Sequence, residues 1–175
     1  VRRHAVKPER RAHPTNDRHT YRRVHSLDPG YAPEFGHRVA LELVAQAEHD
    51  PDALALAVVV GEAAARHVRD ALSAAALTAD RGEVVRASLA ARGGVLEAVT
   101  LAEALAFANE LACEHLLLAV ADPRAALEHV RDAGTVFVGQ TSSVAFGDYL
   151  SGGNHVLPTG GFARLMAGLG TLDFV

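Results

Sequence analysis

Residues 94–120, GVLEAVTLAEALAFANELACEHLLLAV, decide the fold class, because an amphipathic helix stands between two short apolar runs. GVLEAV (94–99) and HLLLAV (115–120) have the length and composition of buried strands. Between them, Thr100 is the expected N-cap of a helix, and Glu103 completes a capping box. This order of strand, helix and strand with short links favours an α/β architecture around a mostly parallel sheet.

The same alternation continues on both sides of this stretch. Toward the C-terminus, Asp122–Pro123 turns the chain into a predicted helix, RAALEHVRDA, which Gly134 should end before the strand TVFVG (135–139). Toward the N-terminus, apolar spacing predicts one more strand and three helices: a strand at 53–60 and helices at 38–49, 62–78 and 82–91.

Residues 1–38 have a different composition from the rest of the chain. They hold nine Lys and Arg against four Asp and Glu, whereas residues 39–175 hold eight against seventeen. Five of the ten histidines also lie here, and neither helical nor strand periodicity is visible. We expect an irregular, disordered basic tail. A nucleic-acid-binding arm is the alternative, but no recognisable motif supports it, and we expect no nucleic-acid partner.

The composition, 49% hydrophobic and 22% charged, is that of a globular protein. No apolar run reaches the roughly 20 residues that span a bilayer, and residues 1–38 lack the apolar segment of a secretory signal. The single cysteine, Cys113, excludes an internal disulfide framework. These features favour a cytoplasmic protein with no membrane partner.

Gln46 and His49 form the first candidate group for chemistry. Residues three apart share a helix face, so the amide oxygen and the imidazole can point at one centre. Both are acceptable ligands for zinc or a similar divalent ion. Taken alone, a Gln and a His near a helix end are more often solvated.

Glu114 and His115 form the second group, between the end of a helix and the start of a strand. Histidine can accept a proton near neutral pH and a carboxylate can activate water. In a turn the two side chains could flank a substrate, although a structural role is the more common one for such a pair taken alone. Cys113 beside them could be a nucleophile, but a small buried thiol is the better interpretation.

The third group lies in the glycine-rich segment SVAFGDYLSGGNHVLPTGGFARLMAGLGTLDFV (143–175). Asp148 and His155 stand among glycines that permit backbone conformations closed to other residues. Such a segment is typical of a structured loop that presents side chains, and it makes a plausible metal or substrate site.

Three ordered blocks resemble the histidinol dehydrogenase family. They are LVAQAEHDPDA, ANELACEHLLL and SVAFGDYLSGGNHVLPTGGFAR, and their spacing also fits, so the likeness covers about residues 39–175. The resemblance implies an incomplete Rossmann-like, three-layer α/β catalytic domain. It also implies oxidation of L-histidinol through L-histidinaldehyde to L-histidine with two NAD and one Zn²⁺ per site, in a homodimer.

Matching motif by motif, the resemblance implies roles for six residues. Gln46, His49 and Asp148 fall on three zinc ligands. His115 falls on the general base and Glu114 on the carboxylate that activates water, while His155 falls on a histidine of the substrate pocket. Gln46, His49, His115 and Asp148 would also contact L-histidinol.

The chain also departs from the family pattern. The family's N-terminal half, a GPSEVL strand, the NAD contacts and a fourth zinc ligand near the C-terminus have no match here, and residues 1–38 resemble nothing in the family. We therefore expect a truncated or frameshifted product with little activity alone. The alternatives are a related zinc- and NAD-dependent alcohol dehydrogenase with another substrate, or a non-catalytic remnant.

Overall fold

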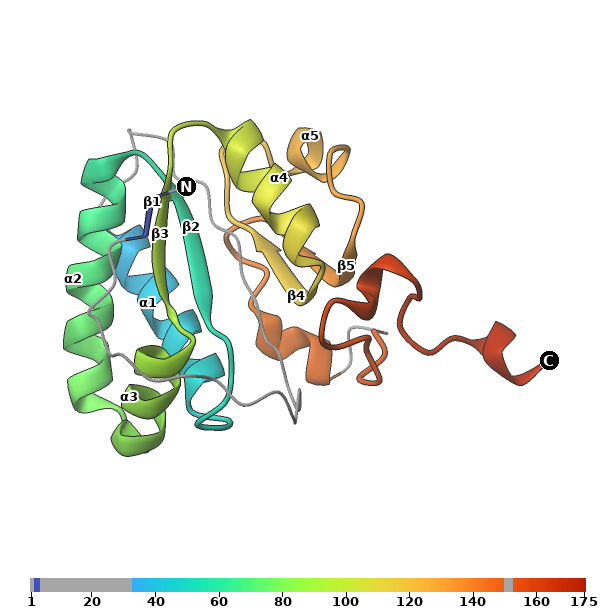
Figure 1. Ribbon diagram of the computed structural model, residues 1–175, viewed down its shortest axis with the longest axis horizontal. Helices are drawn as coiled ribbons and strands as arrows, with labels where there is room; N and C mark the ends of the chain where they lie inside the picture. The colour runs from blue at the N-terminus through green and yellow to red at the C-terminus, as the bar shows by residue number, and fades with distance from the viewer. Residues whose placement is uncertain (1, 4–32, 150–152) are drawn as a thin grey trace.

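The computed structural model describes residues 2–3, 33–149 and 153–175, with only the backbone described for Arg2, Arg3, Pro33 and Asp148. The predicted alternation of helices and strands is confirmed (Figure 1). In chain order the elements are β1 (Arg2–Arg3), α1 (Pro33–Ala47), β2 (Leu56–Val60), α2 (Glu62–Thr78), α3 (Gly82–Ala91), β3 (Gly94–Ala98), α4 (Leu101–Leu111), β4 (Cys113–Leu118), α5 (Pro123–Leu127), β5 (Ala133–Val138) and the 3-10 helices η1 (Val144–Asp148), η2 (Phe162–Arg164) and η3 (Thr171–Phe174).

The described strands form two short sheets. One has the order β1-β3-β2, with β2 parallel to β3 and the two-residue β1 antiparallel to β3. The other is a parallel pair, β4 and β5, in which His115 lies opposite Thr135. The expected parallel character is therefore confirmed, although the strands of the described part of the chain do not join into one sheet.

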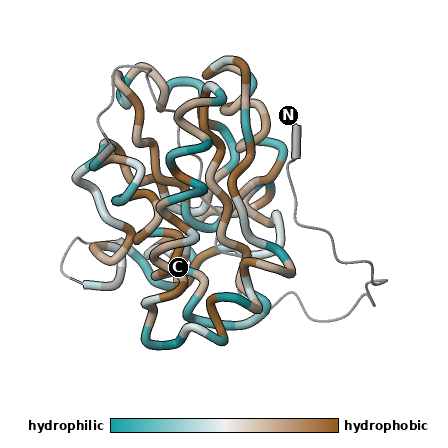
Figure 2. The backbone as a smooth tube through the Cα atoms, turned by 90° about the vertical axis from the view of Figure 1, so that its left-hand side faces the viewer, coloured by the Kyte–Doolittle hydropathy of each residue, from teal (hydrophilic) through white to brown (hydrophobic). Residues whose placement is uncertain are grey.

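Alternate residues of β2 and β4 enter two hydrophobic clusters on opposite faces. Val59 and Leu117 belong to the cluster that contains α1 and α2, whereas Val58 and Leu118 belong to the cluster that contains α4. The strands therefore form a middle layer between two layers of helices (Figure 1). Figure 2 shows the hydrophobic stretches running through this middle layer.

Three predicted helix boundaries were wrong. Helix α1 begins at Pro33 rather than at residue 38, with Glu34 in its first turn and Phe35 buried, and it ends at Ala47 rather than at residue 49. Proline suits the first helical position because its missing N–H would have no partner there, so the sequence did contain this signal. The expected basic tail otherwise falls on residues 4–32, which lie outside the described residues.

Helix α5 ends at Leu127 instead of continuing to residue 133. The buried Asn109 of α4 explains the early end. Its amide donates to the His129 carbonyl at 2.9 Å, and its Oδ1 accepts from the N–H groups of Arg131 at 2.7 Å and Asp132 at 3.4 Å. These backbone groups therefore hydrogen-bond to Asn109 and not to one another in a continued helix. Strand β5 begins at Ala133, one residue before Gly134.

The N-terminus of α4 is capped as expected. Thr100 Oγ1 accepts from the Glu103 N–H at 3.2 Å. The Glu103 carboxylate accepts from the Val99 N–H at 2.8 Å, one residue earlier than in a standard capping box.

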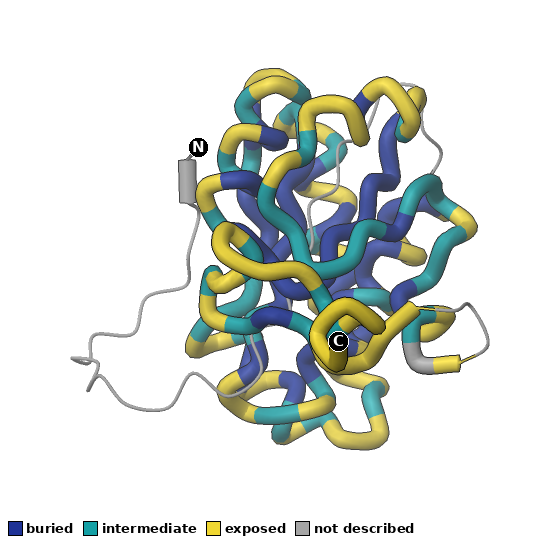
Figure 3. Tube along the Cα trace, turned by 90° about the vertical axis from the view of Figure 1, so that its right-hand side faces the viewer, coloured by how far each residue is buried: buried dark blue, intermediate teal, exposed yellow. Residues whose placement is uncertain are grey.

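The C-terminal segment beyond η1 is an irregular arm of loops and 3-10 turns. It extends away from the layers (Figure 1), and Figure 3 shows its outer part exposed. Leu172 and Phe174 are among its exposed side chains. Among the described residues, no helix is both long enough and apolar enough to cross a membrane.

Candidate active site

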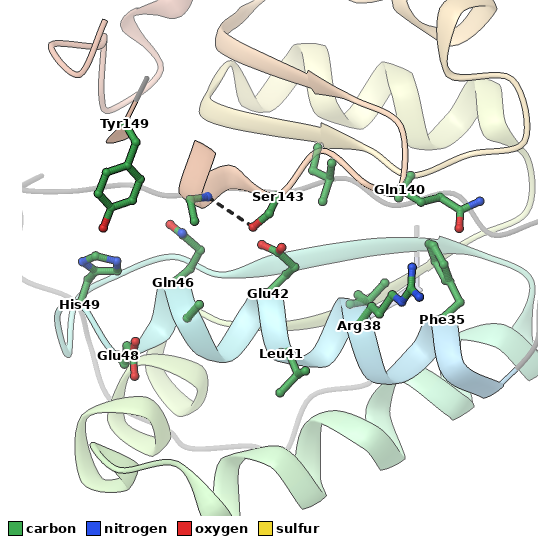
Figure 4. Close-up of a pocket in the computed structure, with 15 residues that line it drawn as sticks. Phe35, Arg38, Leu41, Glu42, Gln46, Glu48, His49, Gln140, Ser143 and Tyr149 are labelled. Carbon is green, nitrogen blue, oxygen red and sulfur yellow. Dashed lines mark hydrogen bonds between the residues drawn. The ribbon is translucent and has the colours of Figure 1, made fainter. Parts of the chain in front are cut away.

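A pocket of about 500 Å³ lies along α1. One wall is formed by the α1 face that carries Gln46 and by His49 in the turn after α1, and the opposite wall includes Ser143 and Tyr149 (Figure 4). Both side chains of the predicted Gln46–His49 pair extend toward this space. Both residues line one pocket, although His49 does so from the turn after α1 and not from the helix face on which the expectation placed it, and their action on one centre stays a prediction.

Gln46 is only 5% exposed, and within the described part of the chain its Oε1 has no hydrogen-bond partner. Leaving a buried acceptor unsatisfied costs about 1–3 kcal/mol, so such atoms call for an explanation. A ligand that accepts an electron pair in this pocket would satisfy the amide oxygen. His49 lies at the exposed end of the same pocket and can supply an imidazole nitrogen.

The third predicted metal ligand, Asp148, occupies the last position of η1, next to Tyr149 of the pocket wall. Its side chain lies outside the described residues, so the joint coordination by Gln46, His49 and Asp148 stays a prediction. Among the residues described, no three His, Cys, Asp or Glu side chains are grouped so as to hold a metal ion.

A second pocket, of about 390 Å³, contains His115 and His155. His115 is 5% exposed, and its ring packs against Phe137 with the ring centroids 5.9 Å apart. His155 is exposed and comes from the loop after η1. Asn154 orders that loop, because its Oδ1 accepts from the Val156 N–H at 2.7 Å and its Nδ2 donates to the Leu169 carbonyl.

Glu114 is a buried carboxyl beside His115. Its Oε1 lies 4.0 Å from His115 Nδ1, and in the described structure Oε2 has no hydrogen-bond partner. Burial raises the pKa of Glu114 to about 7, because desolvation penalises the charged form. A carboxyl with this pKa exchanges a proton readily at neutral pH, which is what a general acid–base group requires.

The Glu114–His115 pair lies within β4 and not in a turn before it, because β4 begins at Cys113. The change of direction between α4 and β4 occurs at Ala112, the C-cap of α4, whose φ of +48° is left-handed. Cys113 is buried, in agreement with its interpretation as a small core thiol.

The five predicted site residues whose side chains are described do not line one common pocket. Gln46 and His49 line the first pocket, His115 and His155 line the second, and Glu114 lines neither. The two pockets are adjacent, because β4 and η1 each contribute lining residues to both of them. Leu117 lines the first pocket two residues after His115 on β4, and the η1 segment supplies Ala145 to the first pocket but Phe146 and Gly147 to the second.

The pockets also include residues that sequence reasoning missed. Glu42 and Ser143 line the first pocket, and Phe146 and Asn154 line the second. Glu42 could have been found, because it stands four residues before Gln46 and therefore on the same helix face. Ser143 and Phe146 could not, because the path of the loop after β5 depends on tertiary contacts.

The fold and these pockets define an α/β protein with a buried Glu114–His115 pair, whose histidine lines one of two pockets. The model of the family "Histidinol dehydrogenase" matches residues 33–175. The chain therefore belongs to the histidinol dehydrogenase family, and the resemblance seen in the sequence is confirmed.

Individual relatives support this assignment. The histidinol dehydrogenase of Pseudomonas aeruginosa is 43% identical over 136 residues, covering 78% of this chain and 31% of the relative. That of Natronomonas pharaonis is 46% identical over 138 residues, covering 78% and 33%. The crystal structure of histidinol dehydrogenase from Elizabethkingia anophelis superposes with a TM-score of 0.78 at 30% identity, over 92% of this chain and 35% of that chain. The chain thus spans about a third of the length of these relatives.

Proposed function

We propose that this chain carries the acid–base groups and part of the zinc site of an enzyme that oxidises L-histidinol through L-histidinaldehyde to L-histidine with two NAD. The observation that carries the proposal is the buried Glu114–His115 pair, in which the carboxyl has a pKa of about 7. Family membership names the substrate class, and the pair supplies proton-transfer groups for both oxidation steps.

Gln46 and His49 would hold the zinc ion, with Asp148 as a third ligand. The buried, unsatisfied Oε1 of Gln46 in the described structure fits this role, because it is an acceptor placed in a pocket without a protein donor. Zinc, when bound, would anchor the substrate's amine and imidazole nitrogens. His49 would contribute an imidazole nitrogen at the exposed end of the same pocket.

In the first oxidation His115 would take the proton from the substrate hydroxyl and then release it to solvent, which restores the neutral base. In the hydration of the aldehyde, Glu114 in its ionised form would accept the proton of the added water. In the second oxidation His115 would take the proton of the hydrate; NAD, when bound, would supply the hydride acceptor for both oxidations. Packing against Phe137 fixes the His115 ring, and His155 lines the second pocket with it as a substrate contact.

We further propose that the remaining parts of the enzyme come from polypeptide not matched here. The NAD contacts and a fourth zinc ligand belong to it, and assembly as a homodimer in the cytoplasm would follow the family. The proposal rests on the short span of the chain, which covers 31–35% of the relatives described above.

The test is an enzyme in which residues 33–175 replace the matching part of a full-length relative. We expect the Glu114→Gln variant to lose roughly 10²–10⁴-fold in rate on histidinaldehyde and much less on the first oxidation of histidinol. His115→Gln should impair both steps. Glu110→Gln, an exposed carboxyl on the preceding helix, is the matched control. Equal losses on both substrates for Glu114→Gln would defeat the division of roles.

A further inference from the structure

The pocket-lining face of α1 carries a second polar group that no role above uses. Arg38, Glu42, Gln46 and His49 recur at intervals of three or four residues and line the same pocket. Figure 4 shows Glu42 and Gln46 side by side, both extending toward Ser143, whereas Leu41 extends to the other side of the helix. Glu42 is half-buried and lies one helical turn before Gln46.

A glutamine ligand has a problem of orientation. Only its Oε1 can bind a cation, while Nε2 is a donor of similar shape that would repel one. The amide must therefore be held with Nε2 against an acceptor. Carboxylates and amides four residues apart on a helix are within hydrogen-bonding reach, and Glu42 is the carboxylate at that spacing on the pocket side.

Charge points the same way. Of the three proposed ligands only Asp148 brings a negative charge to a dication, so a second carboxylate beside them lowers the electrostatic cost of holding it. Residues that orient metal ligands in this way affect metal affinity strongly without touching the metal.

We propose that Glu42 is a positioning residue for Gln46. When a cation is bound, the Glu42 carboxylate would accept a hydrogen bond from Gln46 Nε2, which the described structure does not contain (Figure 4), and would so hold Oε1 toward the cation. This inference rests on the proposed zinc site, since it assigns a function to Gln46 as a ligand.

The experiment measures zinc affinity of the whole 175-residue chain by competition with a chromophoric chelator, using Zn²⁺ alone as the probe. We expect Glu42→Ala to weaken binding by roughly 10–100-fold. Glu42→Gln should recover part of that loss, because its amide oxygen can still accept the hydrogen bond. Glu34→Ala, an exposed α1 carboxylate outside the pocket, should bind like the unaltered chain. Circular dichroism confirms that each variant is folded.

Four results would overturn the inference. Unchanged affinity in Glu42→Ala, while Gln46→Ala weakens binding, would leave the zinc site standing and remove the role of Glu42. Equal losses in Glu42→Ala and Glu42→Gln would show that the negative charge, and not the hydrogen bond, matters. Unchanged affinity in Gln46→Ala itself would remove both the inference and the proposed site. A lowered melting temperature with unchanged affinity would identify Glu42 as merely structural.

Discussion

Replacing Glu114 with glutamine should change how the stability of the chain depends on pH. The pKa of Glu114 is raised by burial from 4.5 to about 7 in the folded chain, whereas in the unfolded chain it returns to its ordinary value. Each factor of ten in proton affinity corresponds to ~1.4 kcal/mol, so ionising Glu114 in the folded chain costs roughly 3 kcal/mol.

The sign of the effect follows from the raised pKa. Below pH 4.5 the carboxyl is protonated in both states, and it imposes no ionisation cost on folding. Between pH 4.5 and 7 the folded chain binds more protons than the unfolded chain, so its stability falls as the pH rises. Above about pH 8 the whole cost is present. The amide that replaces the carboxyl has no proton to lose, and the variant should not show this loss.

The assay is urea unfolding at pH 5, 6, 7 and 8, followed by circular dichroism. We expect the free energy of unfolding of the variant, measured relative to that of the unaltered chain, to rise by roughly 3 kcal/mol from pH 5 to pH 8. His115, whose Nδ1 lies 4.0 Å from Glu114 Oε1, is retained in both proteins. Glu128→Gln, which removes an exposed carboxyl, is the control. Parallel stability profiles for the Glu114→Gln variant and the unaltered chain would refute the reasoning.

Three further predictions concern stability measured by urea unfolding. Ala112→Gly should stabilise the chain by about 0.5–1 kcal/mol, because glycine removes the strain of a left-handed φ; a loss would show that this conformation is not strained. Asn109→Ala should cost roughly 2–3 kcal/mol, because three backbone groups after α5 lose their partner; a loss under ~0.5 kcal/mol would contradict the account of why that helix ends early. Thr100→Ala should cost about 1 kcal/mol by removing the N-cap of α4, and Thr100→Ser should restore most of it.

The elements that could be predicted from sequence are those whose signals are local. Thr100 caps α4 as its position in the sequence predicted, and the apolar runs around residues 58, 96, 116 and 136 are strands. The early end of α5 could not be predicted, because it depends on Asn109, which is twenty residues away from His129 in the chain. The separation of the strands into two sheets is equally non-local, since pairing depends on which strands meet in space.

The candidate site shows the same division. The local spacing of Gln46 and His49 predicted a shared pocket, and the structure has one. The position of His155 relative to His49 depends instead on the path of the chain between β5 and the C-terminal arm. This path places His155 with His115, in a pocket distinct from the one that contains His49.

The segment η1 contributes residues to both pockets and is therefore a physical connection between them. Ala145 faces one pocket while the adjacent Phe146 and Gly147 face the other, and Val144 is anchored in the core. A five-residue turn of this kind cannot shift for one pocket alone. A ligand that displaces η1 in the first pocket therefore changes the free energy of binding in the second, and linkage requires the second ligand to change the affinity of the first by the same factor.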